Sequence, residues 1–113
     1  MGHGAREDAE RLLTRAVMLA PSDAVARYRY ARALDAGGDR VHARDQLEYV
    51  MAARPVAPAI VLAGAYVDYA QRLEEAGDRA RAIAMYRDAA QMIGGDPSAR
   101  DQATRALKRL SAP

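Results

Sequence analysis

The sequence has 113 residues, half of them apolar and 28% charged, a composition typical of a folded rather than a disordered protein. The formal net charge is only +2 and neither half of the chain forms a basic arm, which argues against nucleic acid and acidic membranes as partners. The absence of cysteine excludes disulfides, thiol catalysis and cysteine metal sites. No apolar run reaches the roughly 18 residues that a membrane helix requires, so we expect no membrane insertion.

Glycine and proline divide the chain into segments that are rich in Ala, Leu, Arg, Glu and Gln, which are good helix formers. No segment alternates with period two, so we expect an all-α fold without strands. The predicted helices span residues 5–20, 22–36, 39–54, 58–76, 79–93 and 97–110.

The same residue types recur at fixed distances after three glycines, Gly4, Gly38 and Gly77. The first two glycines are 34 residues apart and the next two are 39 apart. Each is followed by an alanine five residues later, a large residue nine later and a small or medium one twelve later. In chain order these are Ala9, Leu13 and Ala16, then Ala43, Leu47 and Val50, then Ala82, Tyr86 and Ala89. A repeat of this kind predicts an architecture before any local detail does.

The match extends upstream of the second and third glycines, where Tyr, Ala and Leu lie eight, seven and four residues before the glycine. The matching positions are Tyr30, Ala31 and Leu34, and then Tyr69, Ala70 and Leu73. This pattern predicts two antiparallel helices joined by a tight Gly-Asp turn, with Asp39 and Asp78 capping the second helix of each pair. Alanine lies where the paired helices approach most closely, and one such hairpin needs a neighbour to bury its apolar faces.

This arrangement resembles the tetratricopeptide repeat family, whose period is 34 residues of helix–turn–helix. The segment 65–86 is the closest single match, whereas Arg27 stands where the family favours Trp and where the next copy has Tyr66. The resemblance implies a right-handed helical-hairpin solenoid of about six antiparallel helices with a C-terminal capping helix. It also implies a role in binding another protein or a peptide.

The repeat register predicts a single domain over residues 1–113. Its parts are an orphan second helix at 5–20, a repeat at 22–54, a repeat with a five-residue insertion at 58–93 and a capping helix at 97–110. Because helix 5–20 begins the chain in the middle of a repeat, we expect either a fragment of a longer repeat protein or self-association through its uncovered face.

Two apolar segments depart from the repeat. Helix 5–20 is apolar over more than one face, and the insertion at 58–62 lengthens the following helix by more than a turn. The insertion either packs on its neighbour or forms an apolar ledge for a partner. Together these segments give the candidate apolar interface residues Val17, Met18, Ile60, Val61 and Leu62.

No catalytic constellation is present in the sequence, so we expect no enzyme activity and no cofactor. His42, beside a turn, is expected to be a solvated or capping side chain. Glu74, Glu75 and Asp78 form an acidic cluster at a helix end, for which a solvated turn is favoured over a metal site.

The resemblance implies that the first helix of each hairpin lines a concave groove. On helix 22–36 the corresponding face carries Val25, Tyr28, Arg29, Arg32 and Asp35. On the next first helix it carries Gly64, Val67, Asp68, Gln71, Glu74 and Glu75. Such a groove would be basic and aromatic at one end and acidic at the other, which suits a polar peptide. Tyr30, Tyr69 and Tyr86 are expected in the core, whereas the pattern leaves Tyr49 ambiguous.

The sequence therefore favours a protein-interaction or scaffold module, which binds through the groove or through the exposed first helix. The alternative is a structural spacer or self-association unit of a larger repeat protein.

Overall fold

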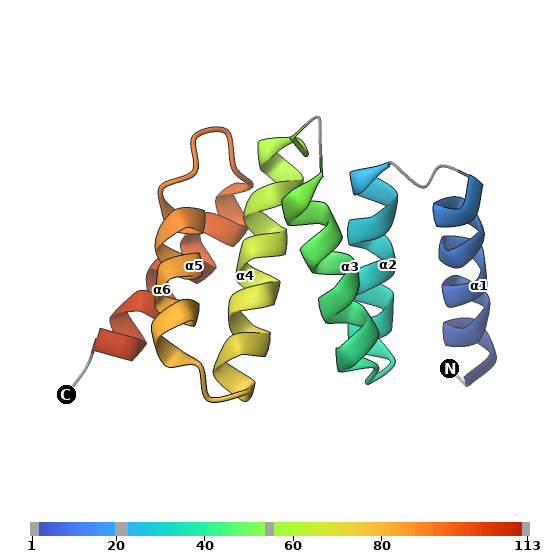
Figure 1. Cartoon of the computed structure of the whole chain (residues 1–113), viewed down its shortest axis with the longest axis horizontal. Helices are drawn as coiled ribbons and strands as arrows, with labels where there is room; N and C mark the ends of the chain where they lie inside the picture. The colour runs from blue at the N-terminus through green and yellow to red at the C-terminus, as the bar shows by residue number, and fades with distance from the viewer. Residues whose placement is uncertain (1–2, 20–22, 54–55, 112–113) are drawn as a thin grey trace. The chain divides into compact units, whose positions relative to one another are not determined.

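The computed structural model describes residues 3–19, 23–53 and 56–111, and all regular structure in these ranges is α-helical (Figure 1). The all-α prediction is therefore confirmed for the described residues. The helices are α1 (His3–Leu19), α2 (Ala24–Ala36), α3 (Arg40–Ala52), α4 (Ala59–Glu75), α5 (Arg79–Ala90) and α6 (Pro97–Ser111). The expected helix ends at 20, 22 and 54, and the expected breakers Pro21 and Pro55, lie outside the described residues. None of the described helices has the length and apolar character needed to cross a membrane.

The chain divides into two compact units, Met1–Val56 and Ala57–Pro113. The boundary falls just before the predicted insertion, which belongs wholly to the second unit. The single-domain organisation over residues 1–113 stays a prediction.

In the first unit, α2 and α3 pack against each other as a helical hairpin, and α1 packs against α2 (Figure 1). Asp23 begins α2, because its side chain accepts hydrogen bonds from the backbone N–H groups of Val25 and Ala26 at 3.0 and 3.2 Å. In the second unit, α4 and α5 form the equivalent hairpin, and α6 packs against both.

The turns of the two hairpins have the same geometry. Gly38 and Gly77 have φ of +87° and +83°, a conformation that glycine adopts without strain. The N–H groups of Asp39 and Asp78 each donate to the leucine carbonyl five residues earlier, at 2.8 Å in both turns. The same aspartates then cap the next helix, accepting from His42 N–H at 3.1 Å and Arg81 N–H at 3.2 Å. The predicted Gly-Asp turns and aspartate caps are confirmed.

The residues that recur in the sequence are the core of the structure. The alanines predicted at the close helix contacts, Ala31, Ala43, Ala70 and Ala82, are at most 1% exposed. Leu34, Leu73, Leu47 and Tyr86 are also buried, together with Val50 and Ala89. Tyr69 and Tyr86 are core residues as expected, whereas Tyr30 is only partly buried, so the expectation for Tyr30 was too strong.

The inserted residues lengthen α4 as predicted, because α4 has 17 residues and α2 has 13. The helix was predicted to begin at residue 58, whereas Pro58 lies at the N-cap position, one residue before α4. Its carbonyl accepts hydrogen bonds from the backbone N–H groups of Val61 and Leu62. The added turn packs against the connection between α5 and α6, since a Cβ atom built on Gly94 would lie 3.5 Å from the Cβ of Ala59. A Cβ atom built on Gly95 would lie 3.0 Å from the Cβ of Ala63, so a side chain there would require its neighbours to move by a few tenths of an ångström.

Helix α6 has the polarity expected of a capping helix. Asp96 accepts a hydrogen bond from the N–H of Ala99 at 3.0 Å, and Lys108 and Arg109 lie in the last turn, which suits the helix dipole. The alanines Ala99, Ala103 and Ala106 of α6 are buried, whereas Leu107 and Leu110 are partly exposed.

Candidate functional site

The face of α2 combines an aromatic ring with two guanidinium groups. Arg29 and Arg32 are exposed, and Arg32 donates a hydrogen bond to the hydroxyl of Tyr28 at 3.0 Å. Val25 is partly buried, and Asp35 forms an ion pair with Arg40 at 3.2 Å. Guanidinium groups recognise carboxylates with two parallel hydrogen bonds, so this face is suited to an acidic group on a partner.

Arg27 of α2 makes two contacts with α3 within the first unit. Its guanidinium carbon lies 3.6 Å from the centre of the Tyr49 ring, and the group also donates to the side-chain oxygen of Gln46 at 3.0 Å. A cation over an aromatic face is attractive. The pair thus joins α2 to α3, and it gives Tyr49, which the sequence left ambiguous, a structural role.

In the second unit, Gln71 and Glu74 line a surface depression of about 470 Å³. The remaining lining comes from Tyr86 of α5 and from Gln102, Arg105, Ala106 and Arg109 of α6. Arg105 forms an ion pair with Asp101 at 3.1 Å. The α6 residues were missing from the predicted site, because the sequence indicated only a helix with one solvated face.

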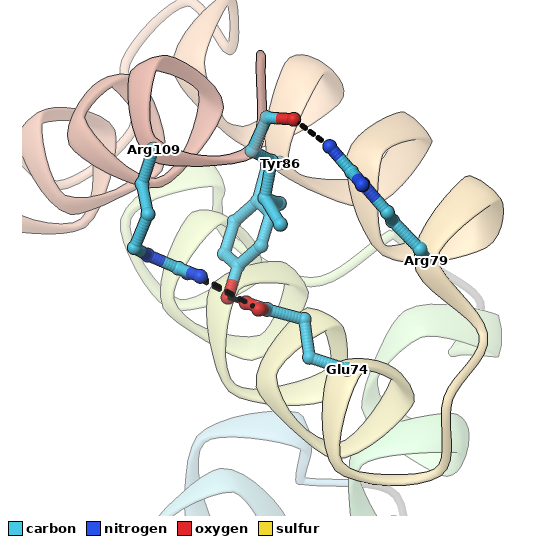
Figure 2. Close-up of polar contacts among 5 residues, drawn as sticks. Glu74, Arg79, Tyr86 and Arg109 are labelled. Atoms are coloured by element: carbon cyan, nitrogen blue, oxygen red, sulfur yellow. Dashed lines mark hydrogen bonds and ion pairs between the residues drawn. The ribbon is translucent and has the colours of Figure 1, made fainter. Parts of the chain in front are cut away.

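Glu74 is the polar centre of this depression (Figure 2). Its two carboxylate oxygens accept hydrogen bonds from Arg109 at 2.8 and 2.9 Å, and one of them also accepts from the Tyr86 hydroxyl at 2.5 Å. The Arg109 guanidinium, followed by the Tyr86 hydroxyl, lowers the pKa of Glu74 below its ordinary value. Burial, reinforced by the hydrogen bond to Glu74, raises the pKa of Tyr86 well above its ordinary value. At neutral pH, Glu74 is therefore an ionised carboxylate that accepts hydrogen bonds from the neutral phenol of Tyr86 and from the Arg109 cation.

A second arginine contact ties α5 to the end of α6. Arg79 donates a hydrogen bond to the backbone carbonyl of Leu110, as Figure 2 shows. That carbonyl belongs to the last turn of α6, where carbonyl groups lack partners within the helix. The last turn of α6 is thus joined to α5 through Arg79 and to α4 through the contact of Arg109 with Glu74.

The predicted acidic end of the groove is not an uncompensated charge. Glu74 is bound by Arg109, and Glu75 forms an ion pair with Arg72 at 3.0 Å. Val67 is only 1% exposed and Gly64 is also buried, so both are core residues and do not line a surface. Asp68 and Gln71 are partly exposed. We correct the prediction accordingly: Val67 and Gly64 do not line a surface, and Glu74 and Glu75 are both paired with arginines.

The candidate apolar interface is divided between exposed and covered residues. Met18 is 75% exposed, whereas Val17 is 9% exposed and belongs to the core. Ile60 is 58% exposed, and Val61 and Leu62 are partly buried. Two residues that were not predicted add to the exposed face of α1, since Leu12 is 70% exposed and Leu19 is 77% exposed.

His42 lies at the exposed start of α3, beside the aspartate that caps this helix. Its Nδ1 atom is 2.7 Å from a carboxylate oxygen of Asp39, while its backbone N–H donates to the other oxygen. Within the described ranges, no three His, Cys, Asp or Glu residues are grouped to hold a metal ion.

We expect the His42 ring to titrate above its ordinary pKa because of its contact with Asp39. The hydrogen bond to Asp39 raises the pKa of His42 above 6.5, and the same contact lowers the pKa of Asp39 below 3.8. The contribution of His42 to stability is therefore complete below pH 6.5 and is lost as the pH rises through its raised pKa. The contribution of Asp39 is complete above pH 3.8 and is lost as the pH falls through its lowered pKa.

An NMR titration of the His42 ring measures this effect directly. The midpoint should lie above 6.5 and return toward this value in Asp39→Ala, whereas Asp45→Ala should change it only slightly, because Asp45 acts on His42 only through a weaker Coulomb interaction. A midpoint at or below 6.5 in the parent chain would contradict the prediction.

A comparison of the chain with protein-family models, curated proteins and solved structures found no match.

Proposed function

We propose that the chain is a tetratricopeptide-like repeat module that binds another protein, with the exposed face of α2 as the principal contact. The observation that carries this proposal is the repetition of one hairpin. The positive-φ glycine, the 2.8 Å turn hydrogen bond and the aspartate cap recur at Gly38–Asp39 and Gly77–Asp78. The same alanine and leucine positions are buried in both copies. This recurrence supports the right-handed solenoid that the resemblance implies.

The side chains on α2 support recognition rather than chemistry. Tyr28 offers a flat amphipathic surface, and Arg29 and Arg32 offer bidentate donors. Tyrosine and arginine are the residue types that dominate the energy of protein interfaces. Since Arg32 already bonds to the Tyr28 hydroxyl, the two side chains are ordered before a partner arrives, which lowers the entropic cost of binding. We therefore propose an acidic, extended or helical peptide as the ligand class.

Binding to an array of acidic peptides, compared between the parent chain and Arg32→Ala, tests this function. For a peptide that binds through α2, Arg32→Ala should weaken the affinity about tenfold, which corresponds to roughly 1.4 kcal/mol. Arg81→Ala, which removes an exposed arginine from α5, is the matched control and should leave the affinity unchanged. NMR shift mapping should then place the changes at Tyr28, Arg29 and Arg32. Shifts that never localise there, for any peptide bound, would contradict the proposal.

The alternative function, a self-association or spacer unit, is favoured by one observation. Leu12, Met18 and Leu19 are at least 70% exposed on α1. Large side chains of this kind, gathered on one helix, mark an interaction surface.

A further inference from the structure

The buried side chains of α6 are all small. They belong to Ala99, Ala103 and Ala106, and the two leucines of this helix are partly exposed. The α4–α5 hairpin, by contrast, buries large side chains such as Leu73 and Tyr86, each 1% exposed. Since burial stabilises in proportion to the apolar area removed from water, the contact of α6 with the hairpin gains less from burial than the hairpin gains from its own core.

The last turn of α6 is held in addition by polar contacts (Figure 2). Arg109 donates two hydrogen bonds to the Glu74 carboxylate of α4, and Arg79 of α5 donates to the Leu110 carbonyl. A bidentate bond between two charged groups is among the stronger hydrogen bonds in proteins. Because the apolar contact beneath α6 is small, this bond contributes a large share of the free energy that holds the helix against the hairpin.

The first turn of α6 is joined to the hairpin by a short connection that contains two glycines. Gly94 has φ of +77°, and neither Gly94 nor Gly95 has a side chain to restrict the backbone. Asp96 caps α6 through the N–H of Ala99, a contact that involves neither α4 nor α5. The turn and the cap of the hairpin lie at Gly77–Asp78, so detachment of α6 leaves them intact.

We propose that α6 detaches from the α4–α5 hairpin as a separate unit, and that the bond between Arg109 and Glu74 sets how often it does so. In the closed form, Ala106 and Arg109 of α6 line the same depression as Tyr86, which is 1% exposed. Detachment exposes the Tyr86 side chain and releases the Glu74 carboxylate from its cation. Helix α6 thus acts as a lid over this part of the hairpin. The proposal does not depend on the peptide-binding face of α2, which lies in the other unit.

Native-state hydrogen exchange, followed by NMR at each backbone amide, tests this proposal in the parent chain. A detached helix of 15 residues is only marginally stable in water, so its amides exchange when α6 opens. The amides of Ala103 and Ala106 should therefore be less protected than those of Tyr69 and Leu73, which exchange when the hairpin unfolds. Their rates should also rise less steeply with denaturant, because detachment exposes less surface than unfolding does.

Two variants separate the lid from the hairpin. Arg109→Ala removes the bond at a side chain that is 58% exposed, so circular dichroism should show a folded chain. The α6 amides should then exchange about tenfold faster, as expected for the loss of a charge-assisted bond. Asp78→Ala removes the cap of α5, a contact that is present whether α6 is closed or detached. It should speed the exchange of the α4 amides about fivefold and leave the α6 amides at the parent rate.

Arg105→Ala is the matched control, because Arg105 is an exposed arginine one turn before Arg109 and pairs with Asp101 of its own helix. It should change the α6 rates by no more than about twofold. Equal protection and equal denaturant dependence of the α4 and α6 amides would overturn the proposal, because α6 would then open only when the whole unit unfolds. Equal acceleration of both sets in Asp78→Ala overturns it as well. The role of Arg109 is wrong if Arg109→Ala changes the α6 rates no more than Arg105→Ala does.

Discussion

Replacing Tyr86 with alanine is expected to lower the free energy of unfolding by about 3–5 kcal/mol, the range found when a large buried aromatic side chain is truncated. Tyr86 is 1% exposed, and its ring occupies the position that Leu47 holds in the other hairpin. The truncation removes a large apolar surface and leaves a cavity between the helices of the second unit. It also removes one of the two partners that hold the Glu74 carboxylate.

Tyr86→Phe separates the two contributions, because it keeps the ring and removes only the hydroxyl. Arg109 still binds both oxygens of Glu74 in this variant, so we expect a smaller loss of about 0.5–1.5 kcal/mol. Chemical denaturation followed by circular dichroism measures both values. If Tyr86→Ala costs no more than Tyr86→Phe, the ring is not the core residue described above.

Enlarging the alanines at the hairpin contacts is expected to have the second largest effect. Ala43 and Ala82 are both fully buried, so Ala43→Leu or Ala82→Leu forces an extra branched side chain between packed helices. Overpacking of this kind costs about 1–3 kcal/mol. Ala84→Leu is the matched control, because Ala84 lies two residues after Ala82 on α5 and is exposed. Denaturation curves for Ala82→Leu and Ala84→Leu that coincide would show that the hairpin register is wrong.

The elements that the sequence predicted well are those with local causes. The helix bounds agree within a few residues, because proline, glycine and the capping aspartates act on the backbone beside them. The two Gly-Asp turns followed from the repeat alone, since a positive φ and a side-chain cap each depend on one or two residues. The buried alanines followed from periodicity, which reports the face of a helix that packs.

The features that the sequence missed depend on distant contacts. Glu74 and Arg109 are 35 residues apart, and nothing near either residue indicates that they meet. The carboxylate of Glu74, which the sequence placed at the acidic end of the groove, is therefore paired with a cation from α6. Val67 was predicted to lie on a surface, because the helical period gives the direction of a side chain. It does not show whether neighbouring residues cover that side chain, and Val67 is in fact buried. The contact of Arg27 with the Tyr49 ring joins two helices, and the sequence around either residue did not indicate it.

The added turn of α4 and the paired glycines before α6 form one structural unit, because they contact each other. Gly94, with φ of +77°, and Gly95 bring the connection down onto Ala59 and Ala63, which lie in the inserted part of α4 and just after it. A deletion of the five inserted residues, which would restore the 34-residue spacing, would remove the part of α4 against which this connection packs. A side chain at Gly95 would instead crowd the Cβ of Ala63 and the carbonyl of Met92, at 3.0 and 3.1 Å. Anyone who shortens, grafts or recombines these repeats should therefore exchange the two segments together.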